Sequence, residues 1–391
     1  MRKDAFCFFL SLFLSRLADQ IILFVVPLVV FTSTQSAAWA GLAFFAESLP
    51  RFLSFPFCGA LCDRKPPVRL LHVSQFYRAL ACVGAIGLHA AFGGLYWLVV
   101  LSAVCGVLTT QGVMAREVIL PQAFGQYSYT RTLSYSQIAD QSGLVLGPVV
   151  AAACLEFWHW SRVMIAVAVL FLLADAVMKL WLRLSPTAIR GFEQRPGRWL
   201  QPLRTALGHI VRLPELRRVV LLAMGVNFVI GVTLASSAAM VIGLHRQSNA
   251  FYAGLQTAGA IATILVLLSI ARTTIPLRWL GRVSYTVIIA GGLLCALAGS
   301  PWGYVAGFLL IVGFDKMFNV YMRSIRQKVI PPQDFGKTTG TATLLNNAPQ
   351  PLAGLLVGAF SGSVGLPWVV FALVATMAGL GIVAQRLAPR A

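Results

Sequence analysis

The chain has 391 residues, of which 58% are apolar and only 11% are charged. Soluble domains carry about 25% charged residues, so this composition excludes disordered chains, coiled coils and small disulfide-rich scaffolds, and it argues against a large soluble enzyme. The 31 lysines and arginines outnumber the 12 acidic residues and give a net charge of +19, which in a soluble protein would indicate a nucleic-acid partner.

Apolar segments long enough to cross a membrane recur along the whole chain. A helix needs about 20 mostly apolar residues to span the hydrocarbon core. The sequence therefore predicts an all-α integral membrane protein with 12 transmembrane helices in two pseudo-symmetric six-helix halves. The predicted spans, in chain order, are 7–31, 38–61, 70–90, 95–115, 132–154, 162–182, 219–242, 250–270, 283–299, 303–322, 339–360 and 367–385.

One long polar connection separates the sixth predicted span from the seventh. It divides the chain into an N-terminal half, residues 1–183, a linker, residues 184–218, and a C-terminal half, residues 219–391. If the N-terminus is cytoplasmic, the inner segments hold 24 lysines and arginines, the outer loops hold 2, and 5 lie inside spans. Basic residues accumulate on the cytoplasmic side of membrane proteins. Both termini and the linker are therefore predicted to be cytoplasmic.

This distribution also explains the excess of positive charge. Because the basic residues mark one side of a membrane, no nucleic-acid partner is expected. The segment 183–218, which includes the linker, holds eight basic residues. We expect this segment to lie along anionic lipid headgroups.

An internal repeat relates the two predicted halves. The sequence VILPQAFG at 118–125 returns as VIPPQDFG at 329–336, an offset of 211 residues. The same offset carries Gly143 onto Gly354 and Gly147 onto Gly358. Two parallel six-helix repeats are typical of secondary transporters, with the substrate site between them near the middle of the membrane.

The loop after the second span carries the residues of a family motif. The segment 59–69, GALCDRKPPVR, resembles the loop motif of the major facilitator superfamily, although a pair of prolines interrupts its basic part. The resemblance implies gating roles for Gly59, Asp63, Arg64 and Arg69. Gly59 would permit close helix approach, and Asp63 would cap a neighbouring helix or pair with a basic residue when the inner side is closed.

Three further segments resemble the drug and siderophore efflux branch of that superfamily, which includes macrolide pumps and the enterobactin exporter. They are RLAD at 16–19, AESLP at 46–50 and GLVLGP at 143–148. The last is similar to the antiporter motif of exporters. It implies that Gly143, Gly147 and Pro148 pack helices and act as a hinge, and the repeat extends this role to the glycines Gly354 and Gly358.

Charged residues inside the spans need partners or a task, because a charge at the membrane centre costs at least about 2.5–3.5 kcal/mol. Three acids have a basic residue within one helical turn, and each such pair can neutralise itself. These pairs are Arg16 with Asp19, Glu47 with Arg51, and Asp175 with Lys179.

Three other charged residues, Arg78, Asp315 and Lys316, are predicted to look to neighbouring helices. Arg78 has no acid near it in the sequence, and Asp140 lies beside two glutamines. Asp315 and Lys316 are adjacent, so we expect each to face a different neighbour.

Buried carboxylates are natural proton carriers, because burial and a nearby cation shift their affinity for protons in opposite directions. In the resembled fold the first, fourth, seventh and tenth spans line the transport pathway. This places Asp19 first and Asp315 second as proton-coupling groups. The predicted coupling residues are Asp19, Asp315, Arg16, Glu47 and Asp140.

Polar and aromatic residues on the same four spans are candidate substrate contacts. Such residues on membrane helices also serve packing and interhelical hydrogen bonds, so we expect only some of them to touch substrate. The candidates are Gln20, Phe24, Gln111, Asn227, Asn319 and Tyr321.

Signatures of catalysis are missing from the sequence. The seven cysteines are scattered, and the chain contains no phosphate-binding loop, nucleophile elbow or His/Cys cluster with metal-ligand spacing. We therefore expect a protein that is not an enzyme, with no cofactor and no metal.

The preferred hypothesis is a proton-coupled exporter of a small amphipathic molecule, a drug-like compound or a siderophore, acting as a monomer in the bacterial inner membrane. Within transporters, uptake of a siderophore or another small metabolite and flipping of a lysophospholipid remain alternatives. From another class, a non-transporting membrane sensor or scaffold remains an alternative. No motif encodes the direction of transport.

Overall fold

The computed structural model describes residues 3–34, 37–94, 96–185, 189, 201–273 and 275–386, and all regular structure in them is helical. The first half of the chain holds α1 (Lys3–Thr34), α2 (Ala37–Cys62), α3 (Pro67–Phe92), α4 (Tyr96–Ala123), α5 (Tyr129–Phe157) and α6 (Trp160–Leu184). The rest holds α7 (Gln201–Arg212), α8 (Pro214–Ala238), the π-helix η1 (Ala239–Leu244), α9 (Asn249–Arg272), α10 (Leu277–Leu297), α11 (Pro301–Val329), the short 3-10 helix η2 (Pro332–Asp334), α12 (Phe335–Asn347), α13 (Pro349–Val364) and α14 (Leu366–Arg386).

The length and apolarity of these helices identify a multi-pass membrane protein. Within the described ranges, nine helices are long and apolar enough to cross a membrane. The expected all-helical membrane class is therefore confirmed. The prediction of twelve transmembrane helices with cytoplasmic termini remains a prediction.

Each predicted span coincides with a helix, but two details differ. The eleventh span, expected to be continuous over 339–360, is interrupted at Ala348, between α12 and α13. Pro349 follows directly and has no backbone N–H to continue the helical ladder. In addition, α4 runs on to Ala123, eight residues beyond the predicted end of the fourth span at 115, so the first copy of the repeated VILPQAFG segment is largely helical.

The described end of the predicted linker forms a helix of its own. In α7 the apolar residues recur every three or four positions, and Ala206 and Ile210 are buried. Arg204 and Arg212 lie on the exposed face of the helix. The next helix, α8, begins at Pro214, because proline is favoured in the first turn of a helix. Helical structure thus resumes earlier than the predicted start of the seventh span.

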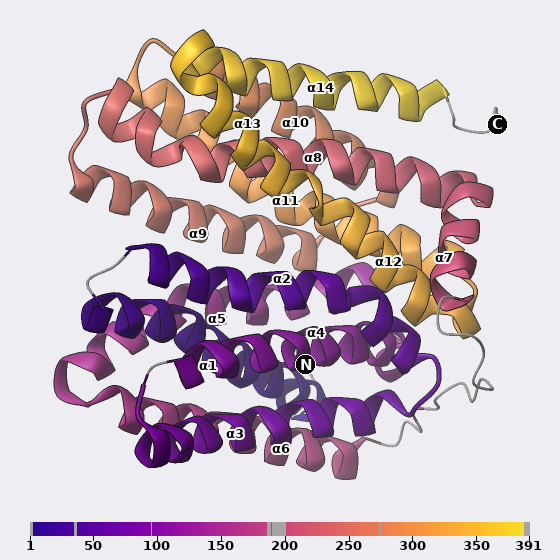
Figure 1. The fold of residues 1–391 in the computed structure, drawn as a ribbon. Coiled ribbons are helices and arrows are strands. Elements are labelled where there is room, and N and C mark those ends of the chain that lie inside the picture. The colour runs from indigo at the N-terminus through magenta and orange to yellow at the C-terminus, as the bar shows by residue number, and fades with distance from the viewer. Residues whose placement is uncertain are drawn as a thin grey trace. The chain divides into compact units, whose positions relative to one another are not determined.

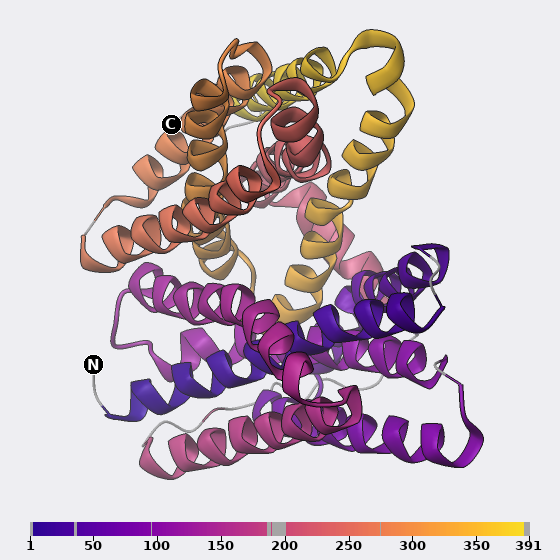
Figure 2. The same ribbon diagram turned by 90° about the vertical axis from the view of Figure 1, so that its left-hand side faces the viewer.

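The chain forms two compact units, each a bundle whose long helices run side by side (Figures 1 and 2). The first unit comprises Met1–Gln126, Tyr135–Pro202 and Gln333–Gly340. The second comprises Tyr127–Ser134, Leu203–Pro332 and Thr341–Ala391. Each unit therefore includes a short segment from the other half of the sequence, at the start of α5 or of α12.

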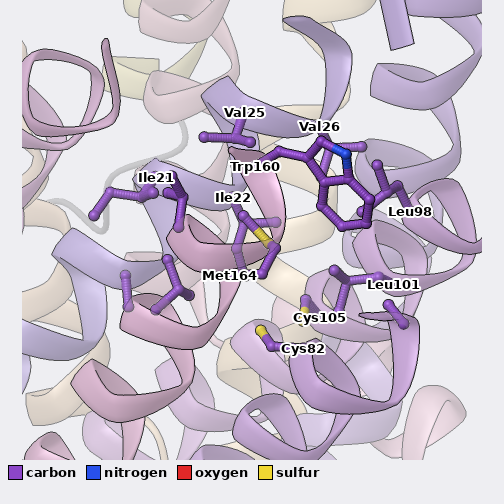
Figure 3. Packing of buried hydrophobic residues seen from close by; sticks show 14 of the residues in the cluster. Ile21, Ile22, Val25, Val26, Cys82, Leu98, Leu101, Cys105, Trp160 and Met164 are labelled. Atoms are coloured by element: carbon purple, nitrogen blue, oxygen red, sulfur yellow. The ribbon is translucent and has the colours of Figure 1, made fainter. Parts of the chain in front are cut away.

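The core of the first unit is built by α1, α3, α4 and α6. Ile22, Val25 and Val26 of α1 pack with Leu98 and Leu101 of α4, and residues of α3 and α6 complete the cluster (Figure 3). From residue 21 to 30 the buried side chains of α1 are all apolar, whereas Ser11, Ser15, Asp19 and Gln20 are buried polar residues on its preceding turns. The helix thus joins a polar region to a tightly packed apolar one.

Candidate functional site

A buried ion pair joins α1 to α3 inside the first unit. Arg78 Nη1 donates to Asp19 Oδ1 at 2.6 Å, and both side chains are almost completely buried. The sequence left Arg78 without a local acid, and Asp19 supplies it from another helix. The expected pairing of Asp19 with Arg16 is wrong in this respect, because the guanidinium bound to Asp19 belongs to Arg78.

Neighbouring side chains complete the coordination of this pair. Thr109 Oγ1 donates to Asp19 Oδ1 at 2.8 Å, and Arg78 Nη2 donates to Ser15 Oγ at 3.1 Å. The guanidinium carbon of Arg78 lies 4.4 Å from the ring centre of Phe171 on α6, in a cation–π geometry. The second carboxylate oxygen of Asp19 has no hydrogen-bond partner in the part of the chain described. A buried carboxylate with a vacant oxygen can accept a proton there.

The glycines of the predicted antiporter motif lie against α1. A β-carbon at Gly143 would approach Cβ and Cγ of Arg16 to 2.9 Å, and one at Gly147 would collide with Cβ of Gln20. These glycines therefore let α5 touch α1 at the turns that carry Arg16, Asp19 and Gln20. Pro148 lies inside α5, next to the second contact.

Two arginines face neighbouring turns of α5. Arg16 lies against Gly143, and Arg116 Nη1 lies 3.2 Å from Oδ1 of Asp140. Asp140 thus has a basic partner on α4.

Of the two remaining acidic residues, Asp175 has the predicted partner and Asp315 does not. Lys179 Nζ lies 2.9 Å from Oδ2 of Asp175, as the spacing predicted, and His72 Nδ1 contacts the other oxygen at 2.5 Å. Asp315 and Lys316 were expected to face different neighbours, but Lys316 Nζ lies 2.7 Å from Asp315 Oδ2. That expectation is wrong because the long lysine side chain folds back onto the adjacent residue.

The three substrate candidates of the first unit differ in burial and in the groups they contact. Gln20 is buried and its amide nitrogen has no acceptor among the described residues. Gln111 is also buried, and its Nε2 lies 3.3 Å from Cys62 Sγ. Phe24 packs against the apolar core cluster. Gln20 also lies against α5, at Gly147.

The substrate candidates of the second unit have local partners. Asn227 Oδ1 accepts from Gln350 Nε2 at 2.7 Å, which joins α8 to α13. Tyr321 packs its ring over Gly281, where a β-carbon would lie 2.7 Å away. Asn319 is half-buried on α11. Among the described residues, none of these three is hydrogen-bonded to another candidate, and their substrate roles stay predictions.

The residues of the loop motif lie where α2 meets the start of α12, within the first unit. Oδ1 of Asp63 accepts from the backbone N–H of Gly336 at 2.7 Å, and Oδ2 accepts from that of Lys337 at 2.9 Å. Asp63 therefore caps the N-terminus of α12. Burial raises its pKa to about 7, against the opposing effects of the two N–H donors and of Lys337.

Close helix contact makes this cap possible. A β-carbon at Gly59 would collide with the carbonyl of Gly336, and one at Gly340 would collide with that of Phe55. Arg64 is half-buried beside the cap, and Arg69 is exposed on the first turns of α3. Gly59 thus has the close-approach role that the motif implies.

For three predicted site positions, Gly354, Glu47 and Gly358, the described structure gives no contact that tests the predicted role. A β-carbon at Gly354 would meet nothing within 4 Å in the described structure. The side chain of Glu47 and the surroundings of Gly358 lie outside the described residues. Their predicted roles remain predictions.

Sequence reasoning missed Arg116 and Arg326. Arg116 was placed just beyond the fourth span, and the extension of α4 to Ala123 moves it into the helix. Arg326 on α11 is buried and donates to Thr343 Oγ1 at 3.0 Å. Extending the predicted fourth helix through 116–123 would have placed Arg116 within it. Among the described residues, no three His, Cys, Asp or Glu side chains group as metal ligands.

Comparison with known families identifies the family of this chain. The sequence model described as Major Facilitator Superfamily matches residues 8–347. The chain belongs to the Major Facilitator Superfamily. Its members are transporters, so the protein is a membrane transporter and not an enzyme.

Individual relatives of this superfamily resemble the chain over different lengths. The Staphyloferrin A transporter of Staphylococcus aureus is 25% identical over 171 residues, which cover 43% of this chain and 43% of that protein. The match thus spans less than half the length of this curated relative.

Solved superfamily structures resemble the whole chain in fold. The human organic anion transporter MFSD10 (TETRAN) has a TM-score of 0.79 at 15% identity, covering 98% of this chain and 99% of that one. A bacterial homologue of the iron transporter ferroportin, in an outward-facing state with soaked iron, has a TM-score of 0.75 at 17% identity, covering all of both chains. The E. coli fucose:proton symporter FucP has a TM-score of 0.72 at 14% identity, covering 99% and 98%.

Proposed function

We propose that the protein is a proton-coupled exporter of a small amphipathic organic molecule, with a siderophore or a drug-like compound as substrate. The observation that carries the proposal is the buried pair of Asp19 and Arg78. A charge pair in a membrane core is costly to retain, and intramembrane acids with a paired base are typical of ion-coupled transport.

The geometry of the pair supplies a coupling step. With Asp19 ionised, Arg78 neutralises it across 2.6 Å. Protonation at the vacant Oδ2 cancels the attraction, which leaves the guanidinium of Arg78 without its counter-charge. Because an unpaired buried cation is unfavourable, helices α1 and α3 then favour another arrangement. Proton binding is thereby converted into helix movement.

The siderophore assignment draws on the Staphyloferrin A transporter. Its similarity extends over 171 residues, and we propose that the shared substrate class extends to this chain. A negatively charged chelator would also suit Arg116, whose guanidinium lies beside Asp140.

Gating is assigned to the cap of α12. We propose that Asp63, helped by Gly59, Arg64 and Arg69, holds the cytoplasmic side closed through the N–H groups of α12. The glycine contacts of α5 at Gly143 and Gly147 supply the packing that the moving helices retain.

The surroundings of the transporter follow from its charge distribution. We propose a monomer in the bacterial inner membrane, with two functional halves, 1–183 and 219–391, and both termini in the cytoplasm. The basic residues of α7 would lie on anionic headgroups, since α7 is amphipathic and carries Arg204 and Arg212. The same role is proposed for the basic residues of 190–198, which lie outside the described residues.

Transport in everted membrane vesicles tests the function. An acidic vesicle lumen, from which protons flow outward, should drive accumulation of a labelled siderophore inside the vesicles, and Asp19→Asn should abolish the dependence on this gradient. The matched control is Lys179→Gln, whose partner Asp175 is also held by His72. Accumulation by intact cells in place of everted vesicles would establish import instead, and unchanged proton-driven transport by Asp19→Asn would remove Asp19 from the mechanism.

A further inference from the structure

We propose that His245 is a proton-binding site at the end of α8, and that binding of a proton there releases this end of the helix from α11. The residue directly follows η1 and lies in the loop before α9. In the predicted topology this loop lies on the outer side of the membrane. The inference goes beyond the proposed transport function, because it depends neither on the substrate nor on the direction of transport.

The backbone around His245 departs from regular α-helical geometry. The last turn of α8 widens into the π-helix η1, and the backbone N–H of His245 closes it by donating to the carbonyl of Met240 at 2.9 Å. The N–H of Gln247 donates to the carbonyl of Val241 at 3.0 Å. Turns of π-helix are rare and occur frequently at functional sites.

The residue after His245 adopts a backbone conformation that favours glycine. Arg246 has a φ of 52°, and no other non-glycine residue in the described ranges has a positive φ. This conformation is unfavourable for a side chain with a β-carbon, so it persists only where surrounding contacts maintain it. The contacts of the neighbouring His245 are therefore expected to hold the turn in place.

The imidazole of His245 packs against a buried tyrosine of α11. The ring centres of His245 and Tyr304 are 5.7 Å apart, and Tyr304 is 1% exposed. On its other sides Tyr304 contacts the ring of Phe308, and its carbonyl accepts from the Cys295 thiol of α10 at 3.7 Å. His245 thus joins the end of α8 to the packed interior of the second unit.

The surroundings of this imidazole suit its neutral form. Nε2 of His245 is enclosed and has no hydrogen-bond partner among the described residues, and the same holds for the hydroxyl of Tyr304. A neutral imidazole can present a lone pair at Nε2, whereas a protonated one always carries an N–H there. Protonation in place would therefore leave a buried N–H without an acceptor, which is unfavourable.

The second unit has almost no negative charge with which to balance an imidazolium. It contains two acidic residues, Glu215 and Asp315. Glu215 lies in the first turn of α8, at the opposite end of that helix. Asp315 lies about three turns beyond Tyr304 on α11, where it is paired with Lys316. A protonated His245 in its packed position would find no counter-charge in either.

The titratable groups near His245 also offer no negative charge. The elements at this end of the second unit contribute Tyr252 on α9, Cys295 on α10 and Tyr304 on α11, which are ordinarily neutral near pH 7. The charged neighbour in the loop is Arg246, which is exposed and positive. Burial lowers the pKa of His245 below its ordinary value of 6.5.

The sign of the pH effect follows from this direction. Because the pKa of His245 is lowered when its ring is packed, the packed arrangement binds a proton more weakly than a released, hydrated imidazole. The packed arrangement is therefore fully stable above pH 6.5 and loses stability as the pH falls below that value. Release of the ring removes the contact that holds the turn after η1, so the backbone bonds to Met240 and Val241 should open with it.

Hydrogen exchange of the purified full-length protein in nanodiscs tests the proposal without requiring transport. The readout is the exchange of the His245 and Gln247 amides at about pH 5 and about pH 8, after correction for intrinsic rates. The variant His245→Phe keeps an aromatic ring against Tyr304 but cannot bind a proton. His159→Gln is the matched control, because it removes an exposed histidine from another loop, before α6.

Wild-type protein and His159→Gln should exchange faster at the lower pH. One bound proton gives a rise of at most about tenfold for each pH unit. In His245→Phe the amide of residue 245 and that of Gln247 should exchange slowly at both pH values. Equal exchange at the two pH values in the wild type, or an unchanged pH dependence in His245→Phe, would overturn the proposal.

A titration of the wild-type protein keeps the proposal testable if His245→Phe does not fold. The chain has five histidines, and selective labelling lets their imidazole NMR signals be followed with pH. One signal should titrate below pH 6.5, together with the change in exchange. Titration of all five at or above 6.5 would contradict the proposal. Failure of proton-driven transport would remove the exporter function and leave these results unaffected.

Discussion

Gly143 on α5 lies in direct contact with Arg16 on α1. A β-carbon at this glycine would come within 2.9 Å of two side-chain carbons of Arg16 and of the backbone nitrogen of Leu17. Contacts that short do not occur, so α5 approaches α1 this closely only because position 143 has no side chain. The glycine motif therefore packs two helices and also places an arginine of the candidate functional site.

Gly143→Ala should displace α1 from α5 and weaken substrate binding. We expect destabilisation of about 1–3 kcal/mol, the usual cost of overpacking, and a loss of transport that exceeds the loss of folded protein. Thermal unfolding in detergent and uptake into proteoliposomes measure the two effects. Gly84→Ala on α3 is the control, because nothing lies within 4 Å of its β-carbon. Equal behaviour of the two variants would remove the positioning role of Gly143.

Asp19→Asn should leave Arg78 as an unpaired buried cation. Breaking a buried pair from one side costs about 3–5 kcal/mol, so the unfolding temperature should fall sharply. The double variant Asp19→Leu with Arg78→Met replaces the pair by apolar side chains and should recover most of the stability. It should not recover proton-coupled transport. Recovery of both would show that the pair is structural only.

The Asp63 cap should depend on pH. Its carboxyl has a pKa of about 7 when the cap is formed, against 3.8 for an unperturbed aspartate. The capped state therefore binds a proton more tightly than the uncapped state between about pH 4 and 7. The stability of the cap falls as the pH rises through 7. Hydrogen exchange at the amides of Gly336 and Lys337 should be slower at pH 6 than at pH 8, after correction for intrinsic rates. Asp63→Asn should flatten this difference, and a persisting difference in that variant would exclude Asp63 as its source.

Asp315→Asn should retain proton-coupled transport. Asp315 is balanced by the adjacent Lys316 at 2.7 Å, and both side chains are partly exposed. Neutralising it leaves Lys316 without its counter-charge, but this lysine is more exposed than Arg78, so the loss of stability should be smaller than in Asp19→Asn. Proton uptake by proteoliposomes measures the coupling. Complete uncoupling in Asp315→Asn, with coupling intact in Asp19→Asn, would reverse the proposed order of the two acids.

Hydropathy and length predicted the helices well, because a membrane imposes the same requirement on every span. The interruption at Ala348 and the short helix α7 were harder to predict. Neither changes the average hydropathy of its neighbourhood, and α7 is visible only through the helical spacing of residues such as Ala206 and Ile210.

Partners on other helices were beyond the reach of the sequence. It indicated that Arg78 needs an acid elsewhere, but the choice of Asp19 depends on how α1 and α3 pack. It also predicted the Asp175–Lys179 pair, which one helix determines alone. The error at Asp315 and Lys316 arose because helical spacing describes Cβ positions, whereas a lysine amine can reach back along four flexible bonds.

The Asp19–Arg78 pair has a consequence for how the chain enters the membrane. Asp19 is synthesised about 60 residues before Arg78, so α1 emerges with a carboxylate whose counter-charge does not yet exist. The helix α3 in turn carries an arginine into lipid unless α1 is beside it. Stable integration of α1 therefore waits for α3, and the biosynthetic machinery must hold the first three helices together until the pair closes.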